Sequence, residues 1–356
     1  MLLKWGICGT GKICSDFVQA VQTLSQENHQ ITSVASRDIS RSRLFGEKLN
    51  IKHCFGSYDE LFGCADVDIV YVGVLNIAHK ARVIDALNAG KHVLCEKPLC
   101  ACSSDVEDIM RIAAKSGKFL MEGYWSTCFP VYRKLIEMKV AGELGDIRLI
   151  SGQFCRVMET EVMTVENAGG GMLSIGYYLP ALAALVFDED PVCIRASGII
   201  NTQGVDTAVT ISLEFTGNRV AVLYNSTTYD GNSEATIEGN FSFVLAVNMD
   251  GGKTLQLMSI IFNLQIDHPF WCPSSATILN KTISSDIPQP EWLTDKTYTY
   301  PNTWGLRFEA QHVYDCINRG LVQSDVWTLK NTLRVSRIIE EVLKQIDYGK
   351  GEERMH

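Results

Sequence analysis

The chain has 356 residues, with 32 Lys plus Arg against 41 Asp plus Glu, a formal net charge of −9, and 46% hydrophobic residues. This composition excludes disordered and collagen-like chains, and the length fits about two domains at roughly 150 residues each. Because affinity for a phosphate backbone requires an excess of Lys and Arg, the negative charge argues against nucleic acid as a partner.

The sequence predicts neither a membrane segment nor a metal site. The start, MLLKWGICGTGKIC, lacks the pattern of a secretory signal, and no apolar stretch reaches about 18 uninterrupted residues. The twelve cysteines include no C-x-x-C pair, and no Cys and His residues have the spacing of zinc ligands. We therefore expect a soluble, cytoplasmic protein with reduced thiols, no membrane partner and no bound metal.

Apolar runs alternate with helical spacing over the first third of the chain. These patterns predict strands at 3–8, 30–36, 67–74, 92–98 and 118–124, with helices between them. Strands that alternate with helices form a doubly wound parallel sheet. We therefore expect an α/β N-terminal domain over residues 1–123.

The pattern changes after Trp125. Helices are predicted near 132–140 and 176–187, and four strand-like runs between 193 and 239 follow one another without intervening helices. Such runs form a mainly antiparallel sheet. Residues 124–356 are therefore expected to form an α+β domain with a large open sheet, closed by two helices near the end of the chain.

A glycine-rich turn, WGICGTGKIC, joins the first strand to the first helix. In a Rossmann fold the first turn glycine, here Gly9, permits the tight bend, and the second, Gly11, lets the backbone approach a pyrophosphate. Lys12 and Ile13 then begin the helix and are expected to contact the dinucleotide. Cys14 stands at the third glycine position and predicts less close packing than glycine allows.

The end of the second strand predicts the choice between NAD and NADP. An NAD-selective fold places Asp or Glu there, but this strand ends in Ser36 and continues with Arg37 and, four residues later, Arg41. Two cations at this point favour the 2′-phosphate of NADP. The alternative is that both arginines are solvated surface charges and that Asp38 binds the ribose hydroxyls.

Glu96, Lys97 and Pro98 follow the fourth strand and resemble the E-K-P signature of the glucose-fructose oxidoreductase and inositol dehydrogenase (Gfo/Idh/MocA) family. The segment GGGMLSIGYY stands where that family has its second catalytic motif, and nearly the whole chain is similar to one branch of the family. The resemblance implies a homodimeric, NADP-dependent oxidoreductase with Glu96 and Lys97 at the cofactor. Its implied reactions are the oxidation of trans-dihydrodiols to catechols and of D-xylose or similar aldoses to lactones.

Such an oxidation needs a general base, because the substrate hydroxyl loses its proton as the hydride leaves the carbon. Tyr178 occupies the family position for this base, and Lys97 is expected to lower the tyrosine pKa from its usual value of about 10. The alternatives are a surface lysine at a strand end and a buried tyrosine with a satisfied hydroxyl. Tyr177 is a lesser candidate, since one residue of offset turns a helical side chain by about 100°.

Three aromatic residues, Trp125, Phe154 and Trp271, match positions of the family's hydrophobic substrate pocket, which suits a flat ring. Their alternative role is as plain core residues. Ser174 also falls in the expected substrate site, where the family has an aspartate. A serine supplies no negative charge to orient a hydroxyl or hold the lysine. Thr127 likewise replaces a family arginine, and these two departures suggest a second function, a catalytically weakened NADP-binding sensor or regulator.

Three further features have structural as well as functional interpretations. His79 is as readily a structural histidine as a catalytic one, and Glu309 with His312 is predicted to be a helix-stabilising surface pair. Residues 241–263 resemble an insertion into the family's sheet. Their two apolar halves around Gly251 predict either an additional hairpin or unspliced coding material that disrupts the sheet.

Overall fold

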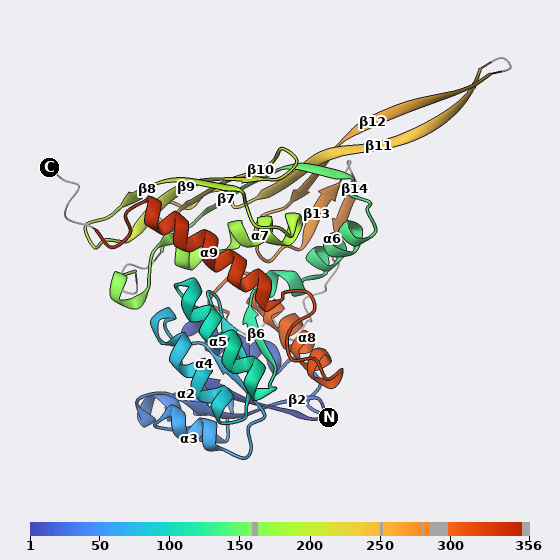
Figure 1. The fold of residues 1–356 in the computed structure, drawn as a ribbon. Helices are drawn as coiled ribbons and strands as arrows, with labels where there is room; N and C mark the ends of the chain where they lie inside the picture. Colours follow the sequence, from blue (N-terminus) through green and yellow to red (C-terminus); the bar gives the residue numbers. More distant parts are fainter. Residues whose placement is uncertain (159–162, 250–251, 279–280, 285–297, 351–356) are drawn as a thin grey trace.

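The computed structural model describes residues 1–158, 163–249, 252–278, 281–284 and 298–350. Two sheets organise these residues (Figure 1). The first has six parallel strands in the order β3-β2-β1-β4-β5-β6, and the second has eight strands in the order β14-β13-β12-β11-β7-β10-β9-β8. The expected fold class, an α/β Rossmann domain followed by an α+β domain, is confirmed.

The N-terminal domain alternates strands and helices as its apolar pattern predicts. Its strands are β1 (Leu3–Cys8), β2 (His29–Ala35), β3 (His53–Phe55), β4 (Ile69–Val72), β5 (His92–Glu96) and β6 (Leu120–Gly123). Its helices are α1 (Lys12–Val21), α2 (Ile39–Leu49), α3 (Tyr58–Gly63), α4 (His79–Asn88) and α5 (Ser103–Ser116). The central strand β4 is buried along its whole length, because a parallel sheet covered on both faces needs continuous apolar strands.

The second sheet is mostly antiparallel, apart from β7 and β10, which pair in parallel. Its strands are β7 (Asp146–Cys155), β8 (Cys193–Ile200), β9 (Asp206–Phe215), β10 (Arg219–Ser226), β11 (Ala235–Met249), β12 (Gly252–Ile266), β13 (Ser275–Ile278) and β14 (Lys281–Ser284). The helices that accompany it are α6 (Pro130–Val140), α7 (Tyr178–Phe187), α8 (Leu306–Asn318) and α9 (Leu329–Gln345). In Figure 1, α6, α7 and α9 lie on the face of this sheet that is turned toward the first domain.

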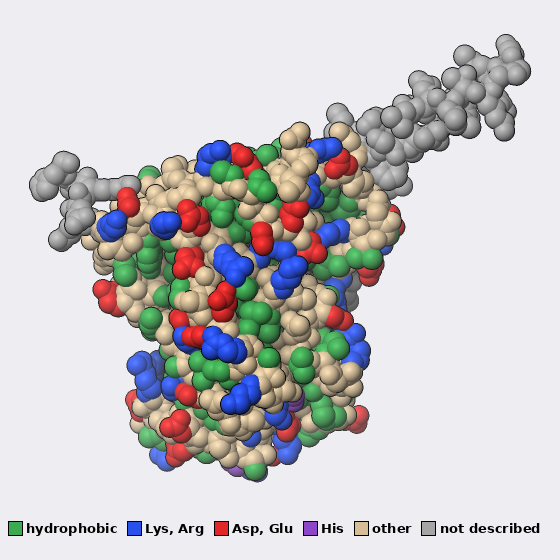
Figure 2. All heavy atoms as spheres, viewed as in Figure 1, with side chains coloured by type: hydrophobic (Ala, Val, Ile, Leu, Met, Phe, Trp, Pro, Cys, Tyr) green, Lys and Arg blue, Asp and Glu red, His purple; other side chains and the backbone are tan. Residues whose placement is uncertain are grey.

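The C-terminal helices connect the two domains. Helix α8 packs on α1, and α9 packs on both α5 and α7. Residues from the end of the chain therefore cover the N-terminal domain, whose last strand ends at Gly123. The surface in Figure 2 has Lys and Arg interspersed with Asp and Glu.

The strands β11 and β12 form a long hairpin that extends beyond the rest of the sheet (Figure 1). Their register runs from the pair Ala235 and Ile266 to the pair Met249 and Gly252. Neighbouring strands pair only with the first part, because β7 reaches Asn240 and β13 reaches Leu264. The segment 241–263 lies within this ladder, apart from residues 250–251, which lie outside the described residues.

Among the described residues, no single helix has the length and apolar character needed to cross a membrane. One bent pair, residues 165–176 with 178–187, meets the length and composition criteria together, with a bend of 53°.

Candidate functional site

The turn after β1 is shaped by two glycines. Gly9 has φ of +120°, and a Cβ there would lie 2.7 Å from the carbonyl oxygen of Gly73. Gly11 is the N-cap of α1, and in the described chain no side chain caps that helix, which leaves its first N–H groups available to an anion. Cys14 is fully buried, and its thiol donates a hydrogen bond of 3.2 Å to the carbonyl of Gly73. Close packing is therefore kept without a third glycine.

Polar groups at the end of β2 are arranged around the start of α2. The Ser36 hydroxyl donates to the carbonyl of Asp38 over 2.7 Å, and the Asp38 carboxylate accepts a hydrogen bond of 2.8 Å from the amide of Ser40. Asp38 is thus the N-cap of α2. Arg37 and Arg41 are exposed, and no carboxylate of the described residues forms an ion pair with either.

A cavity of about 350 Å³ lies where the carboxyl ends of β1, β4 and β5 meet the second domain. Ligands of open α/β sheets bind at such an edge. Eight of the residues predicted from the sequence line it: Ile13, Glu96, Lys97, Trp125, Phe154, Ser174, Tyr178 and Trp271.

Lys97 lies at the end of β5 and points into the second domain. Its Nζ donates a hydrogen bond of 2.6 Å to the main-chain carbonyl of Ser174 and lies 4.7 Å from the ring centroid of Tyr178. Burial lowers the pKa of Lys97 to about 8, while the carboxylates of Glu96 and Glu122 act in the opposite direction. Lys97 is therefore a partly buried group of the cavity and not a surface lysine.

Tyr178, at the start of α7, is buried with its hydroxyl 2.7 Å from the indole N–H of Trp125, which donates to it. Burial raises the pKa of Tyr178 well above its usual value, and the nearby Glu96 raises it further. The pKa of Tyr178 is therefore raised and not lowered as expected, because burial outweighs the effect of the nearby Lys97. The ammonium of Lys97 lies over the ring and donates to a carbonyl, not to the phenol oxygen.

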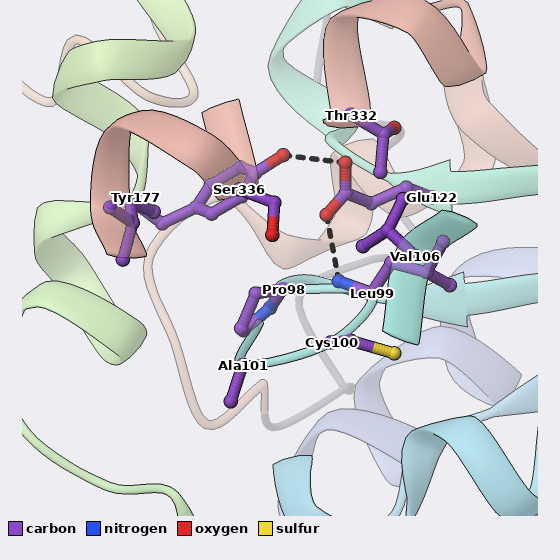
Figure 3. A pocket seen from close by; sticks show the side chains of 10 residues that line it. Pro98, Leu99, Cys100, Ala101, Val106, Glu122, Tyr177, Thr332 and Ser336 are labelled. Atoms are coloured by element: carbon purple, nitrogen blue, oxygen red, sulfur yellow. Dashed lines mark hydrogen bonds between the residues drawn. The ribbon is translucent and has the colours of Figure 1, made fainter. Parts of the chain in front are cut away.

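Tyr177 faces away from the cavity, as its offset from Tyr178 predicts. Its hydroxyl donates a hydrogen bond of 2.6 Å to Glu122, and its side chain borders a separate small pocket (Figure 3). The two neighbouring tyrosines therefore belong to different environments, of which only that of Tyr178 contains Lys97.

The aromatic wall of the cavity is built by residues from four segments. Phe154, near the end of β7, stacks on Trp271 with ring centroids 3.9 Å apart and an interplanar angle of 17°. The rings of Phe154 and Tyr178 are 5.8 Å apart. Trp125, which follows β6, completes the wall through its contact with the Tyr178 hydroxyl. These aromatic side chains line the cavity as well as belonging to the core.

Ser174 lies in a π-helical turn, Met172–Gly176, directly before α7. This turn is held by Asp206, whose carboxylate accepts a hydrogen bond of 2.7 Å from the amide of Met172. The main-chain carbonyl of Ser174 binds Lys97, so the lysine is held at this position without the side-chain negative charge that a serine lacks. Thr127 is buried outside the cavity lining, and its hydroxyl donates to the carbonyl of Tyr124 over 3.0 Å.

His79 is structural in its contacts although it borders the cavity. Its Nδ1 lies 2.8 Å from the carbonyl oxygen of Pro98, and its Nε2 lies 3.1 Å from that of Val74. Burial lowers the pKa of His79. The neutral ring has one N–H and donates to one of these two carbonyls, and the buried ring supports the segment that contains Lys97.

Glu309 and His312 are buried, so the prediction of a surface pair is wrong. Helix α8, which contains both, is covered by α1 and by the turn Trp125–Cys128. His312, Cys316 and Asp325 place possible metal-ligand atoms within 4.8 Å of one another. Two guanidinium groups occupy this cluster, however, since Arg133 lies 3.3 Å from His312 Nδ1 and Arg319 donates to Asp325 over 2.8 Å. Such cations do not fit beside a metal ion.

Sequence reasoning did not identify three residues near the site, Glu122, Arg156 and Tyr300. Arg156 and Tyr300 line the cavity, with the guanidinium 5.6 Å from the ring centroid. Arg156 follows Phe154 by two positions, and this strand spacing was a signal for the same face. Glu122 is a carboxylate in the otherwise apolar run LMEG, a pattern that points to a buried polar contact.

Two family models match the chain. The oxidoreductase family with an NAD-binding Rossmann fold (GFO_IDH_MocA) matches residues 3–124, and the GFO/IDH/MocA C-terminal domain matches residues 132–242. Trans-1,2-dihydrobenzene-1,2-diol dehydrogenase of Xenopus laevis is 33% identical over 349 residues, covering 97% of this chain and 98% of that protein. The Homo sapiens protein of the same name is 32% identical, covering 97% of each.

Solved structures share the fold over most of the chain. The aldose-aldose oxidoreductase from Caulobacter crescentus, complexed with glycerol, has a TM-score of 0.76 at 20% identity and covers 97% of both chains. KijD10, a 3-ketoreductase from Actinomadura kijaniata in complex with NADP and TDP-benzene, has a TM-score of 0.74 at 19% identity and covers 97% of this chain and 98% of that one.

Proposed function

The chain belongs to the GFO/IDH/MocA oxidoreductase family, and we propose that it is an NADP-dependent dehydrogenase of trans-dihydrodiols and of D-xylose or similar aldoses. The observation that carries the proposal is the meeting of Lys97 and Tyr178 in an aromatic-walled cavity at the carboxyl edge of the Rossmann sheet. In the proposed enzyme, residues 1–123 bind the cofactor, and residues 124–356 bind the substrate and form the interface of a homodimer. The absence of disulfides among the twelve cysteines, all in described residues, supports a cytoplasmic location.

The turn after β1 fits a dinucleotide. A Cβ at Gly11 would meet only the carbonyl oxygen of Gly73, at 3.9 Å, and the uncapped N-terminus of α1 presents N–H groups to a pyrophosphate. We place Lys12 and Ile13 beside it, with Glu96 and Lys97 at the nicotinamide end. NADP⁺, when bound, supplies the acceptor for the hydride.

The second strand supports NADP over NAD. Asp38 is engaged as the N-cap of α2, which counts against its binding ribose hydroxyls. Arg37 and Arg41 are exposed beside Ser36 and have no carboxylate partner among the described residues. Two guanidinium groups and one hydroxyl are suited to hold a 2′-phosphate.

Tyr178 receives the proton of the substrate hydroxyl in the proposed oxidation. Two contacts favour its phenolate form: the N–H of Trp125 donates to the oxygen, and the ammonium of Lys97 lies over the ring. Burial opposes this ionisation, so the phenol is the resting form. Lys97 acts on the base across the face of its ring, without being bonded to its oxygen, and in the reverse reduction the phenol of Tyr178 is the acid.

The shape of the cavity supports a small ring substrate. Trp271 and Phe154 present stacked aromatic faces on one side, and a flat dihydrodiol ring packs well on such a wall. The side chain of Ser174 directs its hydroxyl toward the sulfur of Met163 at 3.6 Å, which is a weak contact. The hydroxyl is consequently able to turn toward a substrate hydroxyl.

A catalytically weakened NADP-binding sensor is the second candidate. It is favoured by Ser174, which offers no carboxylate to a sugar hydroxyl. The structure counts against it, since Lys97 is held in place by the Ser174 carbonyl and Tyr178 faces the same cavity.

The deciding experiment uses the purified chain with NADP or NAD and, separately, trans-1,2-dihydrobenzene-1,2-diol or D-xylose, while the absorbance of the reduced cofactor is followed. We expect turnover with NADP on at least one of the two substrates. Tight NADPH binding without turnover on any dihydrodiol or aldose would establish the sensor instead. Failure to bind either dinucleotide would exclude both functions.

A further inference from the structure

Glu122, in β6, is a buried carboxylate that three hydrogen-bond donors approach. The amide of Leu99 donates to one oxygen over 2.7 Å. The Tyr177 hydroxyl donates to the other oxygen over 2.6 Å, and so does the indole N–H of Trp327 over 3.0 Å. Figure 3 shows the first two contacts on opposite oxygens of the carboxylate.

Two of these donors, Leu99 and Tyr177, belong to the segments that contain the proposed catalytic pair. Leu99 lies two residues after Lys97, and Tyr177 directly precedes Tyr178. Lys97 comes from the first domain and Tyr178 from α7 of the second, so their separation depends on how the two segments are joined. We propose that Glu122 is a positioning residue that holds Lys97 and Tyr178 at their working separation. This inference rests on the proposed function.

The bonds of Glu122 suit this task better than the contacts of the pair itself. Lys97 contacts the second domain through one bond to Ser174, in the turn before α7, and through the face of the Tyr178 ring in α7. A lysine stem has several rotatable bonds. A buried carboxylate that accepts hydrogen bonds on both oxygens holds two segments on opposite sides of one planar group. These bonds are strong, because charge-assisted hydrogen bonds are roughly twice as strong as neutral ones.

Glu122 takes no direct part in the chemistry. It borders a pocket separate from the large cavity, and that pocket has no room for a water molecule. Its effect on Lys97 is electrostatic as well as geometric, because its charge raises the lysine pKa. The other groups that face Lys97 are Glu96 at the end of β5, Tyr178 in α7 and His79 in α4.

Two variants separate position from charge. Tyr177→Phe removes the bond to α7 and keeps the charge of Glu122. Glu122→Gln keeps the shape but removes the charge, and it turns an amide N–H₂ toward donors. Thr332→Val is the matched control, because Thr332 borders the same pocket and its hydroxyl has no hydrogen-bond partner in the described structure.

The measurements are kcat and KM for NADP and for substrate over a range of pH. Each is made at a temperature well below the thermal unfolding midpoint of the variant. For Tyr177→Phe we expect kcat to fall between about tenfold and a hundredfold with an unchanged pH profile, because small misplacements of reacting groups have effects of this size. For Glu122→Gln we expect a similar loss together with a shift of the Lys97 ionisation to lower pH. Thr332→Val is expected to match the wild type.

A second measurement follows Lys97 without turnover, by NMR titration of labelled lysines with Lys97→Arg used for assignment. Glu122→Gln is expected to lower the pKa of Lys97, and Tyr177→Phe to leave it unchanged. An active wild type with kcat unaltered in Tyr177→Phe and Glu122→Gln would overturn the positioning role. An unaltered lysine titration in Glu122→Gln would overturn the electrostatic effect of Glu122 on Lys97. Full activity of Tyr178→Phe would instead refute the proposed function. That outcome is distinct from the outcomes that overturn the role of Glu122.

Discussion

The ammonium of Lys97 lies over the ring face of Tyr178, 4.7 Å from its centroid, and not beside the phenol oxygen. The oxygen is instead paired with the N–H of Trp125. A cation over a ring stabilises negative charge spread into that ring, but less directly than a hydrogen bond to the oxygen. The base and its activator are therefore coupled through space, which makes the pH dependence the first test of the mechanism.

Oxidation is expected to become faster as pH rises. The pKa of Tyr178 is well above its usual value, so the phenolate fraction at neutral pH is small and grows about tenfold for each pH unit. Lys97 has a pKa of about 8, and loss of its proton above that pH removes the stabilising cation, so the slope should then decrease. A stopped-flow pH profile of the oxidative step measures both. A rate that is constant or falling from about pH 6 to 8 would contradict the role of Tyr178.

The variant Tyr178→Phe removes the proton acceptor and keeps the ring that packs on Phe154 and faces Lys97. We expect kcat to decrease by about 10² to 10⁴, the usual contribution of a general acid or base. NADPH affinity, measured by fluorescence titration, should stay within about twofold, because the large aromatic surface remains. Trp125→Phe is the companion variant, since it deletes the N–H donor to the same oxygen; a smaller loss of kcat is expected there.

The sequence alone predicted the elements whose signals are local. Continuous apolar strands such as β4 and the glycines of the first turn specify a parallel sheet with a dinucleotide turn, because both depend on neighbouring residues. The family resemblance directed attention to Lys97 and Tyr178, and the structure places both in one cavity.

What the sequence could not predict depends on distant parts of the chain. The raised pKa of Tyr178 results from burial between two domains, which no local pattern reports. Ser174 binds Lys97 through its main chain in a π-helical turn, a contact that the identity of its side chain could not predict. Glu309 is buried because α8 packs against the N-terminal domain, where its carboxylate lies near Gly123 of β6, far away in the sequence.

The cofactor preference is tested at α2. In Arg37→Ala with Arg41→Ala, we expect KM for NADP to rise between about tenfold and a hundredfold while KM for NAD changes little, because only NADP has the 2′-phosphate these guanidinium groups would bind. Arg43→Ala is the matched control, as it removes an exposed arginine of the same helix on another face. A double variant that keeps its preference for NADP would show that other residues select NADP over NAD.

Glu309 is expected to reduce stability. It is fully buried, neither carboxyl oxygen has a partner among the described residues, and burial raises its pKa well above the usual value. Above about pH 4.3 an unfolded chain has lost this proton while the folded one keeps it. The folded state then binds more protons, so this group lowers stability as pH rises until its folded pKa is reached.

Glu309→Met removes this pH-dependent loss of stability and keeps a side chain of similar volume. At about pH 8 we expect the free energy of unfolding to increase by about 1–3 kcal/mol, the usual cost of a buried unsatisfied group, and the gain to shrink as the pH falls toward 4. Urea unfolding followed by tryptophan fluorescence at several pH values measures this. The same change at the exposed Glu137 should have little effect. A destabilised Glu309→Met at about pH 8 would show that the carboxyl is instead stabilised by a contact in the folded protein.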